Sequence, residues 1–171
     1  MARLSLRTMT VDEFDQFLAR SVRLFAAEQV VSGKWSAEEA ETCAIERNNL
    51  LLPQGLNTPG MLLLAAENMD GVEIGHLWVT LQPTPGSGVG AWIYYIEIEP
   101  EHRGKGYGSA LMLAAEQEVA RHGVSTIGMN VFGWNSIARS LYEKSGYQIM
   151  SMQLRKEITT LPSQGDGRAK L

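Results

Sequence analysis

The chain has 171 residues, of which 44% are hydrophobic and 20% are charged, and its formal net charge is -4. These values are typical of one globular domain with a single core, and a net negative charge without a clustered basic face argues against nucleic acid as a partner. No apolar run reaches the roughly 18 residues of a membrane span and the N-terminus lacks a signal-peptide core, so we expect a soluble, cytoplasmic protein with no membrane partner.

The chain begins with a predicted strand and a long predicted helix. Apolar and polar residues alternate over residues 4–9, which indicates a short strand. Thr10 and Glu13 have the spacing of a capping box, so we expect a helix to begin at this point. Apolar residues then recur every three or four positions and predict its buried side: Phe14, Phe17, Leu18, Val22, Phe25 and Ala26. We interpret this stripe as core rather than as a binding groove.

A second helix is predicted where Ser36 and Glu39 repeat the capping-box spacing, and it should end near Leu51. It carries the single cysteine, Cys43, which excludes an internal disulfide. No motif marks Cys43 as a reactive thiol, so we interpret it as a structural residue of the helix. A turn-rich connector over residues 53–60 follows.

Two further strands, over residues 61–67 and 72–81, are predicted to form a hairpin through the Asp-Gly pair at residues 70–71. His76 lies in the second of these strands. Because no Cys or His lies at metal-ligand spacing from it, we interpret His76 as a strand histidine and expect no metal site. A flexible turn over residues 83–90 leads to the next strand.

The central strand, a glycine loop and a helix follow one another without a gap. An apolar strand over residues 91–99 leads into Arg-Gly-Lys-Gly-Tyr-Gly at residues 103–108, and helical character continues to about Arg121. A glycine loop at a helix start directs backbone N–H groups and the positive end of the helix dipole at one point, which suits a phosphate. The spacing fits neither a Walker loop nor a dinucleotide fingerprint. We therefore expect another phosphate-bearing cofactor.

The last third of the chain predicts a strand over residues 126–132, a helix that begins at Asn135, and a final strand over residues 148–158. Asn135 is a natural N-cap. Residues 135–147 read Asn-x-x-Ala-x-x-Leu-Tyr-Glu-Lys-x-Gly-Tyr. The remaining residues, 159–171, carry Gly-Asp-Gly and scattered charges and are expected to be a flexible tail. We therefore expect a single domain over residues 1–158.

These two blocks carry a resemblance to a known family. The loop at residues 103–108 resembles the acyl-CoA pyrophosphate loop of the GNAT N-acetyltransferase superfamily, and residues 135–147 are similar to the second characteristic block of those enzymes. The resemblance covers residues 60–157. It implies an α/β GNAT fold, with a central mixed, mostly antiparallel sheet of six to seven strands that is flanked by about four helices and splayed at its central strands.

The resemblance implies that acetyl-CoA is the co-substrate. Its pyrophosphate would lie against the loop and the helix start, and its pantetheine arm would follow the backbone of the central strand, where a bulge is common, and contact the N-cap of the last helix. The residues expected to bind it are Ile96, Ile98, Arg103, Gly104, Lys105, Gly106, Tyr107, Gly108, Ser109 and Asn135. The alternative is that these residues have structural roles only. Arg103 and Lys105 would then be solvated surface charges, and the side chains of Ile96 and Ile98 would belong to the core.

The resemblance also implies catalytic residues. The hydroxyl of Tyr142 would protonate the leaving thiolate, a task that suits a neutral phenol; the alternative is an aromatic residue that packs the helix. Related enzymes place a glutamate base at the position of Asn130 or early in the central strand, where this chain has Tyr94 and Tyr95. Glu97 is then the candidate base beside the expected acyl site, and the alternative is a strand-edge charge.

The sequence thus predicts an N-acetyltransferase that moves an acetyl group from acetyl-CoA directly to a primary amine in a ternary complex. No Ser or Cys nucleophile with a His partner indicates a covalent intermediate. The alternative from another class is an acyl-CoA-binding sensor without turnover. The acceptor stays open among polyamines, antibiotics, amino acids, peptide N-termini and protein lysines. The resemblance also allows a homodimer.

Overall fold

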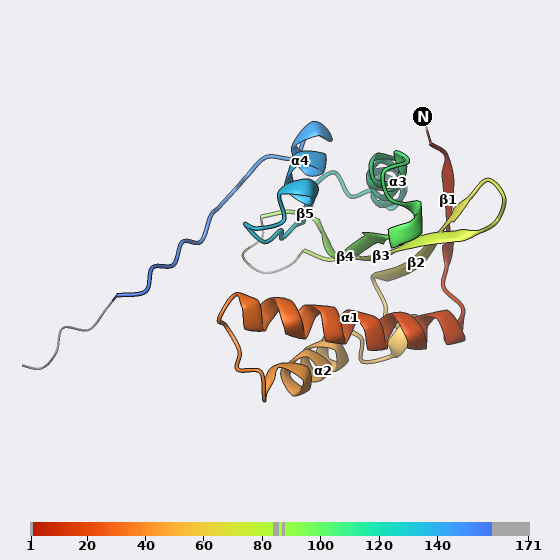
Figure 1. Cartoon of the computed structure of the whole chain (residues 1–171). Helices are drawn as coiled ribbons and strands as arrows, with labels where there is room; N and C mark the ends of the chain where they lie inside the picture. Colours follow the sequence, from red (N-terminus) through yellow and green to blue (C-terminus); the bar gives the residue numbers. More distant parts are fainter. Residues whose placement is uncertain (1, 84–85, 87, 159–171) are drawn as a thin grey trace, which may run out of the picture.

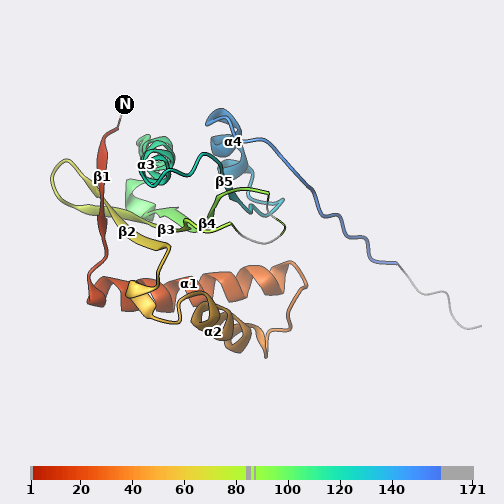
Figure 2. The same cartoon turned by 180° about the vertical axis from the view of Figure 1, so that it is seen from behind.

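The computed structural model of the protein describes residues 2–83, 86 and 88–158. Figure 1 shows a sheet between two layers of helices, and the view from behind in Figure 2 agrees. In chain order the elements are β1 (Leu4–Thr8), α1 (Val11–Val31), α2 (Ala40–Leu51), η1 (Gly55–Asn57), β2 (Met61–Asn68), β3 (Glu73–Thr80), β4 (Ala91–Ile98), η2 (Pro100–His102), α3 (Tyr107–Arg121), β5 (Ile127–Met129) and α4 (Ser136–Lys144). Helices α1 and α2 cover one face of the sheet, and α3 and α4 lie on the other.

The strands form one sheet in the order β1-β2-β3-β4-β5. Neighbours are antiparallel from β1 to β4, whereas β4 and β5 are parallel and are joined through α3. This mixed sheet with four flanking helices confirms the α/β class. The expected six to seven strands are too many, because residues 148–158 form no strand, are exposed, and lead away from the sheet in Figure 1. The expected tail, residues 159–171, lies outside the described residues, as do residues 84–85 and 87.

Helix α1 begins where its capping box predicts. The Thr10 hydroxyl accepts a hydrogen bond from the Glu13 amide at 3.3 Å, and the Glu13 carboxylate accepts one from the Thr10 amide at 2.7 Å. The Ser36 hydroxyl likewise accepts from the Glu39 amide at 3.3 Å, but this bond closes a turn, and α2 begins only at Ala40. None of the helices among the described residues combines the length and apolar character of a membrane span.

The sheet separates two hydrophobic cores. Leu77 and Trp78 are neighbours on β3 and are both buried, but they belong to different cores. The core on the α3 side contains Leu77, Ile93 and Leu111. The core on the α1 side contains Phe17 and Trp78, and Leu18 of the predicted stripe packs against it as a partly buried residue. The central strands are therefore buried on both faces, as in a sheet covered by helices on each side.

Strand β4 carries the bulge that the resemblance implies. Trp78 pairs with Tyr95 and Val79 pairs with Ile93, which leaves Tyr94 as an extra residue. As a result, the consecutive side chains of Tyr94 and Tyr95 both pack on the α1 side. Two residues of β4 on either side of the bulge, Ile93 and Ile96, pack on the α3 side.

Strands β4 and β5 pair over only three residues each and then diverge. Their pairing joins Ala91–Ile93 to Ile127–Met129 and, in the described part of the chain, goes no further. The splay expected at the central strands is confirmed. Strand β5 is shorter than the predicted residues 126–132. The backbone of β4 from Tyr94 to Ile98 therefore extends past the end of β5 and, among the described residues, has no strand partner on that edge.

Candidate active site

The glycine loop ends in a helix start that no side chain caps. Gly104 and Gly106 have φ angles of 74° and 85°, in the left-handed region that favours glycine, and Gly106 is the N-cap of α3. Within the described residues, the amides of Tyr107, Gly108 and Ser109 donate to no protein acceptor. Uncapped amides at the positive end of a helix can bind an anion such as a phosphate.

Gly108 brings this helix start close to α4. A Cβ atom at Gly108 would lie 3.1 Å from Cδ2 of Leu141, so a side chain at this position would press against α4. The φ angle of Gly108 is not in the left-handed region, and the glycine is needed for the close approach rather than for a turn. The two sequence blocks that predicted the family therefore meet in space at this contact.

The two cations of the loop bond to the strand and turn before it. Arg103 donates from Nε to the Ile98 carbonyl at 2.8 Å and from Nη2 to Glu97 Oε1 at 2.7 Å. Lys105 donates from Nζ to the Glu101 carbonyl at 2.8 Å. The Arg103 side chain remains 55% exposed, so both groups stand at the surface beside the uncapped amides.

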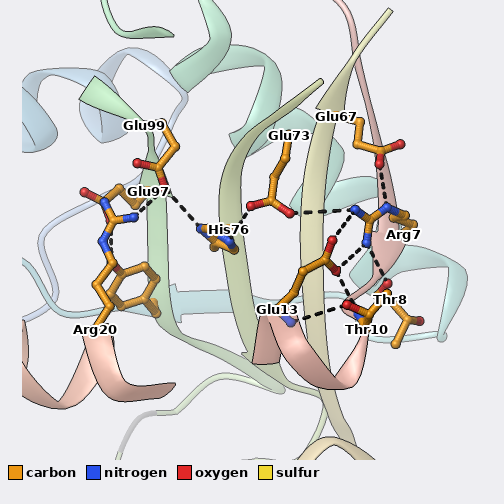
Figure 3. A network of polar contacts seen from close by, with 11 residues as sticks. Arg7, Thr8, Thr10, Glu13, Arg20, Glu67, Glu73, His76, Glu97 and Glu99 are labelled. Atoms are coloured by element: carbon orange, nitrogen blue, oxygen red, sulfur yellow. Dashed lines mark hydrogen bonds and ion pairs between the residues drawn. The ribbon is translucent and has the colours of Figure 1, made fainter. Parts of the chain in front are cut away.

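Glu97 lies beside Arg20 of α1 in Figure 3, and its carboxylate is held by three donors. Its carboxylate lies 2.7 Å from Arg103 Nη2 and 2.9 Å from Arg20 Nη2, and it also accepts a hydrogen bond from the Tyr95 hydroxyl. Burial and that hydrogen bond raise the pKa of Tyr95, so the phenol stays protonated and donates. With its side chain only 16% exposed, Glu97 has both oxygens engaged.

A chain of ion pairs continues from Glu97 across the α1 face of the sheet, as Figure 3 shows. Arg20 Nη1 lies 2.5 Å from Glu99 Oε1. His76 lies between two glutamates: its Nδ1 is 3.5 Å from Glu99 Oε1, and its Nε2 is 3.1 Å from Glu73 Oε1. Burial alone would raise the pKa of Glu99, but the hydrogen bond and charge of Arg20 outweigh it and hold that pKa below its usual value. His76 is buried within this chain of charges.

The start of α4 matches its prediction. The Asn135 side chain accepts a hydrogen bond from the Ala138 amide at 3.1 Å, which confirms Asn135 as the N-cap. Tyr142 lies in the last turn of α4 and is partly buried, with its ring centroid 6.2 Å from that of Tyr147. Asn130 follows the end of β5 and is exposed.

Glu28 of α1 belongs to the same region, although the sequence gave it no role. Burial raises the pKa of Tyr142, and the negative charge of Glu28 raises it further. Burial also raises the pKa of Glu28, with a further contribution from the charge of Glu97. Glu28 therefore lies within electrostatic reach of both Glu97 on β4 and Tyr142 on α4. Only the folded arrangement reveals this, because no sequence motif connects α1 to these later elements.

The predicted site residues thus fall into three groups. Residues 103–109 form the loop and helix start, Asn135 and Tyr142 lie on the adjoining α4, and residues 96–98 belong to the part of β4 beyond the β5 ladder. The side chains of Ile96 and Ile98 pack in the core on the α3 side, so only their backbone could serve a ligand, and the Ile98 carbonyl already accepts a hydrogen bond from Arg103.

Comparisons with known proteins agree with this arrangement. A family model described as "Acetyltransferase (GNAT) family" matches residues 24–147. An uncharacterized N-acetyltransferase of Bacillus subtilis (strain 168), YycN, is 30% identical over 155 residues, which make up 91% of this chain and 99% of the relative. The crystal structure of the putative acetyltransferase YycN from Bacillus subtilis superposes with a TM-score of 0.85 at 29% identity and covers 92% of this chain and 99% of that one. A mycothiol acetyltransferase of Kytococcus sedentarius is 26% identical over 145 residues, 85% of this chain and 45% of the relative.

Proposed function

The chain belongs to the GNAT acetyltransferase family and is an acyltransferase, and from that premise we propose that it transfers an acetyl group from acetyl-CoA directly to a primary amine. The observation that carries this proposal is the set of uncapped amides at the start of α3, next to the part of β4 that β5 leaves unpaired. The uncapped amides suit a diphosphate, and the part of β4 that β5 leaves unpaired suits an extended arm that adds to the sheet as a strand would. The cytoplasmic location expected from the sequence remains part of the proposal.

The residues present fit acetyl-CoA, whose thioester supplies the acetyl group. The amides of Tyr107, Gly108 and Ser109 would hold the diphosphate, and Arg103 and Lys105 stand beside them as cations. The backbone of Ile96 and Ile98 would line the pantetheine arm, together with the side chain of Asn135. An N–H on β4 aimed at the thioester oxygen would stabilise negative charge as it develops there.

Tyr142 is proposed to protonate the leaving thiolate. Burial and the charge of Glu28 keep its pKa above the usual value, so the phenol carries its proton at neutral pH. For Glu97 the contacts favour a structural role over the role of base. Its two oxygens already accept from Arg20, Tyr95 and Arg103, and it would position the loop arginine rather than take a proton.

Replacement of Tyr142 by Phe tests the proposed activity. We expect the kcat for thiol release to fall by about 10²-fold or more, because a positioned general acid contributes roughly that much. The Kd for acetyl-CoA should change little, because the hydroxyl serves the reacting sulfur rather than the diphosphate. The assay measures free CoA thiol with a panel of primary amines, and calorimetry measures the Kd.

Tyr147→Phe is the matched control, because it removes a neighbouring hydroxyl whose ring contacts that of Tyr142. It should retain wild-type kcat. Equal losses of kcat and affinity in Tyr142→Phe would contradict the assigned role. The alternative, a binding-only sensor, is favoured by the absence of a glutamate at the exposed Asn130. Such a protein would be thermally stabilised by acetyl-CoA yet would release no thiol with any amine.

A further inference from the structure

We propose that Glu28 is the catalytic base that takes a proton from the acceptor, and that the acceptor is a cationic amine that approaches from the α1 side of the sheet. The inference rests on the proposed acetyl transfer, which requires an ammonium group to lose a proton before its nitrogen can attack. The position that supplies a glutamate base in related enzymes holds Asn130, an amide, and the carboxylate of Glu97 is already engaged.

The first support is the position of Glu28. Helix α1 runs beneath the sheet, and its C-terminal half, which carries Glu28, lies under β4, β5 and α4 in both Figure 1 and Figure 2. The charge of Glu97 on β4 acts on Glu28, and the charge of Glu28 acts on Tyr142 of α4. The cation that α2 contributes to this region is Arg47, whose guanidinium lies over the rings of Phe25 and Tyr94. Glu28 therefore lies on the side of the sheet opposite α3, on the half of α1 under β4 and β5 and within electrostatic reach of Glu97 and Tyr142.

The second support is that Glu28 lacks a partner. Within the described residues its carboxylate forms no hydrogen bond and no ion pair, although it is partly buried. Other partly buried glutamates on this face have arginine partners: Glu13 pairs with Arg7, and Glu97 and Glu99 pair with Arg20. The carboxylate oxygens of Glu28 are not among the buried polar atoms without a partner, so an unpaired carboxylate remains open to a cationic group that a ligand brings.

The third support is the proton affinity of the carboxylate. Burial, followed by the charge of Glu97, raises the pKa of Glu28 above that of an ordinary glutamate. A raised pKa brings a carboxylate closer to the operating pH, where a base accepts a proton more effectively. The same negative charges attract an ammonium group and disfavour an anionic acceptor.

The proposed step balances in atoms and charge. The ammonium gives one proton to Glu28, and the freed lone pair forms a carbon–nitrogen bond to the acetyl carbonyl carbon. The carbon–sulfur bond breaks, and the thiolate takes the proton of Tyr142. The phenol regains a proton from the nitrogen, which leaves a neutral amide. The products are the amide, the thiol and one proton on Glu28, which passes to water.

The experiment compares Glu28→Gln with Glu46→Gln, an exposed glutamate on α2 that serves as the matched control. The probes are a diamine, a triamine, an aminoglycoside, an amino acid and a short peptide with a free N-terminus. The kcat/KM for thiol release is measured with the best of these from about pH 6 to about pH 10, and thermal shifts with acetyl-CoA are recorded for each variant. Near neutral pH, Glu28→Gln should lose about 10² to 10⁴ in kcat/KM.

The pH profile separates a base from a structural residue. As the pH approaches the ordinary amine pKa of about 10, free amine forms in solution and the deficit of Glu28→Gln should shrink. Its thermal shift with acetyl-CoA should equal that of wild type, and Glu46→Gln should match wild type throughout. Wild-type kcat/KM in Glu28→Gln, or an equal loss at every pH, would overturn the assignment and leave acetyl transfer standing. A wild-type protein that releases no thiol with any amine would overturn both.

Discussion

Glu28 and Glu97 are two glutamates of the same region in different surroundings, and the roles proposed for them differ accordingly. Glu97 accepts from two arginines and a tyrosine, whereas Glu28 has no donor within the described residues and has a raised pKa. The sequence singled out Glu97 because it lies near the loop, and it gave no signal for Glu28. The contacts that decide between them join distant positions; Arg20 and Glu97, for example, are 77 residues apart. Such pairings follow from the fold and have no local pattern.

The pair of Arg7 and Glu13 predicts a pH dependence of stability. The hydrogen bond from Arg7, which outweighs burial, lowers the pKa of Glu13 from 4.5 to about 2. Because the folded pKa is the lower one, the stabilisation is fully present above about pH 4.5 and is lost as the pH falls through about 2. The free energy of unfolding should therefore fall over this window, and Glu13→Gln should make the fall less steep. Urea denaturation at a series of pH values measures it.

Glutamine at position 13 keeps the capping box, so this variant removes the charge and leaves the helix start. Asp15→Asn, at an exposed position of the same helix, is the control and should keep the wild-type slope. An unchanged slope in Glu13→Gln would show that other carboxylates dominate acid unfolding.

At the scale of elements, the sequence predicted best what local chemistry decides. The Thr10 cap, the Asn135 cap and the Asp-Gly hairpin were confirmed, because each depends on residues within one turn of each other. The start of α2 was placed too early, since the Ser36 hydroxyl closes a separate turn. The final strand over residues 148–158 was wrong for a different reason. A strand forms only beside another strand edge, and residues 148–158 alone do not show whether such an edge is available to them.

The contact between α3 and α4 predicts the effect of a substitution at Gly108. In Gly108→Glu the side chain would press on Leu141 and would place a negative charge among the amides proposed to hold the diphosphate. We expect the affinity for acetyl-CoA to fall by about 10²-fold or more. This corresponds to a loss of about 3 kcal/mol of binding free energy when the charge-assisted contacts to the phosphates are lost. Calorimetric titration with acetyl-CoA measures the Kd.

Asn49→Glu introduces the same charge on an exposed position of α2 and should leave the Kd unchanged. Gly108→Ala should be intermediate, because only the end of a flexible leucine must move. If Gly108→Glu bound acetyl-CoA as tightly as wild type, the phosphate site would have to lie elsewhere.

At the scale of the whole molecule, the sheet joins two cores into one cooperative unit. Leu77 is fully buried on the central strand β3, in the core on the α3 side. Leu77→Ala should lower the free energy of unfolding by about 2–5 kcal/mol, because it removes buried methyl groups and leaves a cavity. Leu50→Ala, at a residue that is 82% exposed, should change it by less than about 0.5 kcal/mol. Chemical denaturation measures both, and equal effects would contradict the burial of β3.

The overall architecture was predictable because two motifs in a fixed order carry the family. The two motifs, with a helix and a strand between them, implied a sheet, flanking helices and a splay at β4. Each of these features is present in the described residues. The acceptor side was not predictable. As proposed above, it includes residues of α1 that come near β4 and α4 only in the folded chain, and no spacing along the sequence records that proximity.

The bulge at Tyr94 determines which face of the sheet each later side chain of β4 lies on. Side chains alternate between faces, so if Tyr94 paired with Trp78 in a regular ladder instead of bulging, the rest of the strand would turn over to the other face. Glu97 would then point into the apolar layer beneath α3, and Ile96 and Ile98 would face the arginines of α1. A one-residue insertion or deletion after the bulge should therefore be far more damaging than a point substitution, because it exchanges the ionic face of the strand for its apolar one. Deletion of Tyr94 itself should be milder, because it restores regular alternation and keeps the later residues on their faces.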